Sequence, residues 1–410
     1  MDDGGAVTLR ARYVFPIVGQ PIEGGTITLR GDRIIAVGRS KNEPVTRDLG
    51  NAAILPGLVN AHTHLEFSDL RSPLGQAGAS LPDWIRQVLL TRETAARSAV
   101  TSISRGLSES IAAGATMLGE IATGPLASEF YCRADVTVFR ELIAMSAQRA
   151  PQQLAVAERH LVGPWPHEAL RPGLSPHAPY TVSPRLLDSA ITLARAWNVP
   201  AAMHLAESRE ELELLAAGTG PLVELLKERG VWTPGTVARG TRPLDYLRAL
   251  AQAPRSLVIH GNYLAPDEID FLGQHRQQMS VVFCPRTHAR FGHDPYPLGR
   301  LLAAGAQVAL GTDSRASNPD LSLLNEMRFV VERYRVGPQV VLELATRNGA
   351  AALGRLQDAG MLEAGKLANL AVVALPDRRC KDPHELLLEQ DAHVIQTWWR
   401  GRRVYDALAE

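Results

Sequence analysis

Eight short apolar segments, separated by longer stretches of helical character, are the feature that most constrains how this 410-residue chain can fold. Strands that alternate with helices are typical of a parallel sheet, and eight such units in about 300 residues predict an α/β fold, a TIM-type (β/α)8 barrel. An open doubly wound sheet would usually have fewer strands and an early glycine-rich phosphate loop, and no GxGxxG occurs. The predicted strands cover residues 57–65, 115–122, 135–143, 171–179, 199–207, 256–264, 279–287 and 307–314, with helices such as 183–197 and 209–218 between them.

Both ends of the chain contain short strands separated by glycine turns. The N-terminal part includes TITLR and RIIAV, and the C-terminal part includes LAVVAL and HVIQTWW. The alternation of apolar and polar residues in TITLR and RIIAV predicts half-buried antiparallel strands. Because chain termini commonly lie near one another, we predict that residues 1–56 and 363–410 form one β-sandwich domain beside a barrel of residues 57–362.

Composition excludes several classes of protein. Lys+Arg and Asp+Glu both number 43, so the chain lacks the basic excess of a nucleic-acid binder. No window approaches the ~20 apolar residues of a membrane span, and the acidic N-terminus has no secretory layout. The cysteines Cys132, Cys284 and Cys380 form no CxxC pair. We therefore expect a cytoplasmic protein with a small-molecule substrate and no nucleic-acid or membrane partner; monomer and homodimer both stay open.

The histidines suggest a metal site. His62 and His64 lie one residue apart, so on a strand both would project from one face. That pair alone fits a polar loop equally well. However, five histidines and one aspartate recur at predicted carboxyl ends of barrel strands, where such enzymes build their active sites. They are His62, His64, His177, His204, His260 and Asp313.

From this register we assign His62, His64, His204 and Asp313 as ligands of a divalent metal ion. Three imidazoles and a carboxylate suit Zn²⁺, with Fe²⁺ and Mn²⁺ as alternatives. Water bound to such an ion loses a proton near neutral pH and becomes a nucleophile. Glu207 follows three residues after His204, where a carboxylate can move protons between water and substrate. Alternatively, Glu207 could be an acidic residue that stabilises the N-terminus of the following helix. Glu210 and Glu211 are available for that role, which leaves Glu207 free.

Several motifs together resemble the amidohydrolase superfamily, in its branch of aminohydrolases and chlorohydrolases. The matching pieces follow the family's order from Pro56 to Arg328: PGLVNAHTHLE, SPHAPYTVS, MHLAESREE, VIHGNYL and ALGTDSRASNPDLSLLNEMR. The last is the most specific, and the flanking β segments match the family's small sandwich domain. This branch includes S-adenosylhomocysteine and methylthioadenosine deaminases, guanine deaminase and triazine hydrolases.

The resemblance implies one metal ion held by the four ligands above. It makes Glu207 a proton shuttle, His260 a partner of the attacking water and His177 a residue that faces the substrate. Binuclear members of the superfamily bridge their metals with a carboxylated lysine from a mid-barrel strand, and this chain has no lysine between Lys41 and Lys227. One ion is therefore predicted, although a glutamate bridge stays open.

Further substrate contacts are suggested by polar and aromatic residues near the strand ends. The segment after the seventh strand contains Arg286 and His288, which are equally suited to a polar substrate group or to pairing with carboxylates. Arg140 and Glu141 end the third strand. Trp84 begins a predicted helix over residues 81–90 and could cover an aromatic ring, although such a tryptophan is more often part of a core.

The predicted reaction is hydrolytic deamination of an amino-substituted heterocycle, a purine or purine nucleoside derivative such as an adenosine-like or aminodeoxyfutalosine-like compound. Water activated by the metal would attack the carbon that carries the amino group while Glu207 protonates the adjacent ring nitrogen. His260 and Asp313 would relay protons as ammonia leaves. The alternatives are hydrolytic dechlorination or amide hydrolysis on a related ring, and an inactive relative that serves as a scaffold. Because every expected ligand is present, we discount the scaffold.

Overall fold

A computed structural model describes residues 5–39, 44–94, 99–124, 133–146, 148–407 and 409. Lys41 and Cys132 therefore lie outside the described residues, as does the start of the predicted β domain at residues 1–4. The two cysteines within the described ranges, Cys284 and Cys380, are free. None of the described helices combines the length and hydropathy that a bilayer-spanning segment needs.

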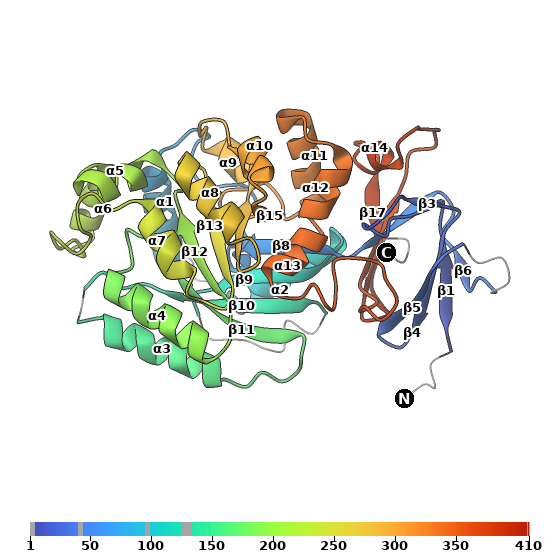
Figure 1. Cartoon of the computed structure of the whole chain (residues 1–410), viewed down its shortest axis with the longest axis horizontal. Helices are drawn as coiled ribbons and strands as arrows, with labels where there is room; N and C mark the ends of the chain where they lie inside the picture. The colour runs from blue at the N-terminus through green and yellow to red at the C-terminus, as the bar shows by residue number, and fades with distance from the viewer. Residues whose placement is uncertain are drawn as a thin grey trace.

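Eight parallel strands in sequence order form the barrel predicted from the alternating pattern (Figure 1). Strand β8 lies beside β15 through a bridge between Thr63 and Asp313, which brings the first and last strands of the sheet together. The strands are β8 (Leu58–Thr63), β9 (Ala115–Ala122), β10 (Asp135–Leu142), β11 (Leu170–Pro176), β12 (Ala201–Leu205), β13 (Ser256–His260), β14 (Met279–Phe283) and β15 (Gln307–Leu310).

Helices occupy the segments between these strands, and Figure 1 shows them around the barrel. The predicted helices over 183–197 and 209–218 correspond to α4 and α5, which begin after serine N-caps. Ser183 and Ser208 each accept a hydrogen bond from a backbone N–H three residues later, which satisfies one of the free donors at a helix start. The helices are η1 (Leu65–Phe67), α1 (Leu81–Thr94), α2 (Ala99–Ala112), α3 (Ala150–Val162), α4 (Pro184–Ala196), α5 (Arg209–Ala217), α6 (Pro221–Glu228), α7 (Pro243–Leu250), α8 (Pro266–Gln274), α9 (Pro285–Arg290), α10 (Leu298–Ala303), α11 (Leu323–Tyr334), α12 (Pro338–Leu344), α13 (Arg347–Ala352) and α14 (Pro383–Leu387).

Two further sheets come from the ends of the chain and lie side by side beyond the barrel (Figure 1). One has the order β5-β4-β1-β6, in which β4 and β5 are antiparallel, as the alternation in TITLR and RIIAV predicted. The other has the order β18-β17-β16-β7-β2-β3 and joins strands from both chain ends. Their bounds are β1 (Val7–Arg10), β2 (Tyr13–Val14), β3 (Ile22–Glu23), β4 (Thr26–Arg30), β5 (Arg33–Gly38), β6 (Arg47–Asp48), β7 (Ala52–Pro56), β16 (Leu370–Ala374), β17 (His393–Trp399) and β18 (Arg402–Asp406).

These two sheets share one apolar core. Leu9 and Ile27 of the first sheet pack in the same cluster as Ile54 and Val372 of the second. Apolar side chains from two facing sheets are the core of a sandwich, which fits the predicted fold. The domain boundaries at residues 56 and 363 remain a proposal.

The barrel strands bring polar residues from distant parts of the sequence to one rim. The interior of the barrel is filled by apolar side chains such as Met117, Phe139 and Ile259. Beyond this packed layer, at the carboxyl ends, the buried residues become polar and include His62, His204 and His260. In barrels of this kind the active site lies at the carboxyl ends of the strands. The buried polar residues at this rim therefore indicate a candidate functional site.

Candidate metal centre

Three buried imidazoles meet at the rim. His62 lies in β8, His64 follows that strand, and His204 lies in β12; one ring nitrogen from each can be chosen so that all three lie within 4.8 Å of one another. Both ring nitrogens of His62 and Nδ1 of His64 are buried without a hydrogen-bond partner. Burial lowers the pKa of His62 and His64 well below the usual value, and that of His204 to about 4. Neutral imidazoles grouped in this way, with three ring nitrogens left without a hydrogen-bond partner, fit a bound divalent cation.

The orientation of His204 also fits this interpretation. Its Nδ1 lies 3.1 Å from the carbonyl oxygen of His177, to which it can only donate. Its Nε2 then carries a lone pair and lies 3.4 Å from Nε2 of His64. A hydrogen bond from the far ring nitrogen that fixes the tautomer is typical of histidines that bind metals.

Asp313 lies next to the three imidazoles. Its Oδ1 is 3.6 Å from Nε2 of His62 and 3.7 Å from Nε2 of His64, and its Oδ2 accepts a hydrogen bond of 2.5 Å from the Ser317 hydroxyl. The backbone of Asp313 has φ of 56°, which an aspartate tolerates better than most residues. Thr63 Oγ1 donates to the Asp313 carbonyl at 2.9 Å. The carboxylate is thus held toward the imidazoles, where it can serve as a fourth ligand.

Glu207 and His260 form a second buried pair beside this centre. Glu207 Oε1 lies 3.5 Å from His260 Nε2. Burial raises the pKa of Glu207 well above the usual value of a glutamate. Burial also lowers the pKa of His260 well below the usual value of a histidine. The backbone of Glu207 is fixed because its N–H donates to Glu211 at 3.0 Å and its carbonyl accepts from Asn262 at 2.8 Å. The N-cap of α5 is Ser208, so Glu207 is not used as the helix cap.

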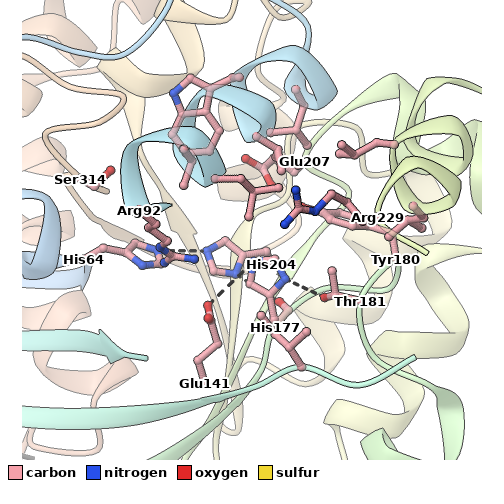
Figure 2. A pocket seen from close by; sticks show the side chains of 18 of the residues that line it. His64, Arg92, Glu141, His177, Tyr180, Thr181, His204, Glu207, Arg229 and Ser314 are labelled. Atoms are coloured by element: carbon pink, nitrogen blue, oxygen red, sulfur yellow. Dashed lines mark hydrogen bonds and ion pairs between the residues drawn. The ribbon is translucent and has the colours of Figure 1, made fainter. Parts of the chain in front are cut away.

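Glu207 and His260 line a cavity of about 260 Å³ together with His64, His204 and Asp313 (Figure 2). His177 and Glu141 lie on its floor with His177 Nε2 3.9 Å from Glu141 Oε1, and His177 Nδ1 is 2.7 Å from Thr181 Oγ1. Burial lowers the pKa of His177 to about 3 and raises that of Glu141. Trp84 lines the cavity as well, and its indole N–H donates to the Ala316 carbonyl at 3.1 Å.

The structure brings most of the sequence-predicted site residues to this cavity. His62 lies fully buried behind the lining. The predicted residues that line the cavity are His64, Trp84, Glu141, His177, His204, Glu207, His260 and Asp313.

Three predicted substrate contacts lie elsewhere. The Arg286 guanidinium binds Asp320 at 2.6 Å and Glu326 at 2.7 Å, so it serves an internal ion-pair network. His288 Nε2 lies 2.9 Å from the Asp294 carbonyl, and Arg140 binds the carbonyl of Gly124. Arg140, Arg286 and His288 do not line the cavity. Arg286 and His288 are engaged by neighbouring parts of the fold, whereas Nε of Arg140 is buried without a hydrogen-bond partner. Their place outside the cavity gives no support to their prediction as substrate contacts.

Five polar lining residues were missed by sequence reasoning: Tyr180, Thr181, Ser314, Arg92 and Arg229. Ser314 directly follows the predicted ligand Asp313 in the ALGTDSRAS motif, so its position was available as a signal. Tyr180 and Thr181 belong to the SPHAPYTVS motif, so their nearness to His177 was available as a signal. Arg92 and Arg229 lie at the ends of α1 and α6 and carry no local signal, because only the packing of these two helices turns them toward the rim.

Comparison with known proteins identifies the same family that the sequence motifs resemble. A model of the amidohydrolase family matches residues 53–404. The chain is 30% identical over 409 residues to the 5-methylthioadenosine/S-adenosylhomocysteine deaminase of Moorella thermoacetica, covering 93% of this chain and 89% of that protein. It is 30% identical over 358 residues to the aminodeoxyfutalosine deaminase of Deinococcus radiodurans, covering 80% of this chain and 81% of that protein.

A solved structure with the same architecture is that of Helicobacter pylori aminofutalosine deaminase in complex with methylthio-coformycin. It matches with a TM-score of 0.85 over 97% of this chain and 100% of that chain, at 22% identity. At that identity the match supports the barrel fold with its flanking sheets and nothing further about the chemistry.

Proposed function

The chain belongs to the amidohydrolase family, and on that premise we propose that it is a metal-dependent hydrolytic deaminase of a purine nucleoside derivative. The observation that carries this proposal is the placement of the buried Glu207–His260 pair beside the three-histidine centre, at the inner end of the cavity. The names of the two relatives that are 30% identical, both deaminases, support the reaction and the class of substrate.

We propose that one ion binds, with His62, His64, His204 and Asp313 as its ligands. Nitrogen ligands with one carboxylate favour Zn²⁺ over the harder Mg²⁺ or Ca²⁺, and Fe²⁺ or Mn²⁺ are the alternatives. The absence of lysine between Lys41 and Lys227 supports a single ion. When bound, the cation supplies a Lewis acid that lowers the pKa of water to about 7.

The residues of the chain then handle the protons. Water adds to the ring carbon that carries the amino group, and Asp313 accepts a proton from that water. Glu207, whose pKa is raised by burial, holds a proton and donates it to the adjacent ring nitrogen. His260, within 3.5 Å of Glu207, stabilises the charge that develops. The amino group then takes the proton held by Asp313, the carbon–nitrogen bond breaks and ammonia leaves. The proton of the added hydroxyl passes to Glu207 as the carbonyl forms, which returns both carboxyl groups to their starting states.

The proposal is tested by measuring ammonia release from adenosine, methylthioadenosine, S-adenosylhomocysteine and aminotriazines, with chloride release from chlorotriazines measured in parallel. We expect ammonia from at least one purine nucleoside and a dependence on bound metal. Chloride release without ammonia from any purine nucleoside would favour the dechlorinase alternative instead. If the chain binds no divalent metal, both the deaminase and the dechlorinase hypotheses would be contradicted.

A further inference from the structure

The outer wall of the cavity differs in character from its floor. The floor carries the histidines and carboxylates described above, whereas the wall is formed by apolar side chains of α1 and α6. These include Leu81, Ile85, Val88, Leu89, Leu225 and Leu226. If the purine ring reaches the metal centre, as the proposed function requires, the rest of the substrate extends along this aliphatic wall.

Two arginines end the apolar wall. Arg92 lies in the last turn of α1 and Arg229 is the C-cap of α6, and both line the cavity. Figure 2 shows Arg229 extending into the cavity from the side of α6, above His177 and His204. Arg92 approaches from the side of His64, and its positive charge opposes the rise in the Glu141 pKa that burial causes.

Each guanidinium is held from outside the cavity. Arg92 binds Glu66, and Arg229 binds Glu93 at 3.1 Å. Neither Glu66 nor Glu93 lines the cavity, so the arginines and not their partners face a bound molecule. These contacts use one terminal nitrogen of each arginine, and a guanidinium has five N–H donors.

We propose that Arg92 and Arg229 form a subsite for an anionic group. The substrate would then be a purine nucleoside derivative whose sugar-side substituent is apolar along its length and ends in a carboxylate. The planar fork of a guanidinium matches a carboxylate. Because Glu66 and Glu93 offset the two positive charges, the subsite suits a singly charged group better than a doubly charged phosphate. This inference rests on the proposed deaminase function.

A matched pair of probes separates recognition of the anion from catalysis. The acid is 5′-deoxy-5′-(4-carboxybenzylthio)adenosine, and its methyl ester has nearly the same shape without the charge. The measured quantity is the ratio of kcat/KM for ammonia release from the acid to that from the ester. This ratio does not depend on the fraction of correctly folded enzyme, so partial loss of a variant cannot mimic the result.

We expect the wild-type ratio to exceed about ten, as one or two charge-assisted hydrogen bonds would give. Arg92→Met and Arg229→Met should each lower it, and the double variant should bring it near one. Arg86→Met is the matched control, because Arg86 also pairs α1 with α6, through Glu228 at 2.9 Å, but does not line the cavity. It should keep the wild-type ratio.

Two results would overturn the subsite. One is a wild-type ratio near one, and the other is a high ratio that persists in the double variant, since the anion would then be recognised elsewhere. In both cases the proposed deaminase function would stand. Ammonia from neither the probes nor any other purine nucleoside would instead refute the proposed function, and this inference with it.

Discussion

Replacing Glu207 by glutamine keeps the size of the side chain and removes the carboxyl group that can hold and release a proton. The side chain is 8% exposed and lies 3.5 Å from His260 Nε2, so bulk water has little access to take over its role. A lost general acid–base group typically lowers the rate by ~10²–10⁴. Because burial limits substitution by water, we expect the upper half of that range, a loss of about 4–5.5 kcal/mol of transition-state stabilisation at 1.36 kcal/mol per tenfold change.

The assay is steady-state ammonia release at saturating substrate, with elemental analysis of the same samples. Metal content should stay at the wild-type level, because the backbone contacts of Glu207 through Glu211 and Asn262 do not involve its carboxylate. Glu210→Gln, at a half-buried position in the first turn of α5 that does not line the cavity, is the matched control and should retain full turnover. If Glu207→Gln turns over within tenfold of wild type with its metal bound, the proton-shuttle assignment is wrong.

The remaining predictions concern the metal, the contact of Asp135 in the barrel with Arg400 of the β domain, and the pH dependence of stability. His204→Ala should lose metal and activity together, whereas two tightly bound ions per wild-type chain would contradict a mononuclear centre. Asp135→Ala should destabilise the fold by about 3–5 kcal/mol in denaturant titrations, because it removes the carboxylate that accepts hydrogen bonds from the buried Asn369 amide at 2.9 Å and from Arg400 at 2.9 Å. Asp267→Ala, which breaks an exposed pair, should leave stability nearly unchanged. Burial raises the pKa of Glu211 from 4.5 to about 7, so its contribution to stability is lost as pH rises through that interval. Relative to wild type, Glu211→Gln should therefore gain up to about 3 kcal/mol between pH 5 and 8, at 1.36 kcal/mol per pKa unit, and a pH-independent difference would contradict this.

Local pattern and topology were enough to predict the barrel and the grouping of its histidines. Parallel strands of one barrel present their carboxyl ends at one rim, so His62, His204 and His260 could be expected together once the strands were identified. Their separation in sequence did not matter, because the strand order of the barrel follows the chain order. The same reasoning placed Asp313 beside them.

Whether a longer polar side chain faces the cavity depends on its partners in the fold, and local sequence patterns do not predict those partners. Arg286 was an equal choice between substrate and carboxylate, and the fold pairs it with Asp320 and Glu326, 34 and 40 residues away. Arg92 and Arg229, which carried no signal, reach the cavity because α1 packs against α6. Long flexible side chains can point in several directions, so which of them faces a ligand is decided by tertiary packing.

The sequence by itself therefore determined the class of fold and the family, together with the set of residues that meets at the rim, because strand-end positions follow from chain topology. Only the tertiary structure decided which charges surround the cavity and how they are oriented. Its walls come from helices whose mutual packing depends on the whole chain. For this reason the proposed reaction was visible in the motifs, whereas the proposed carboxylate subsite at Arg92 and Arg229 was not.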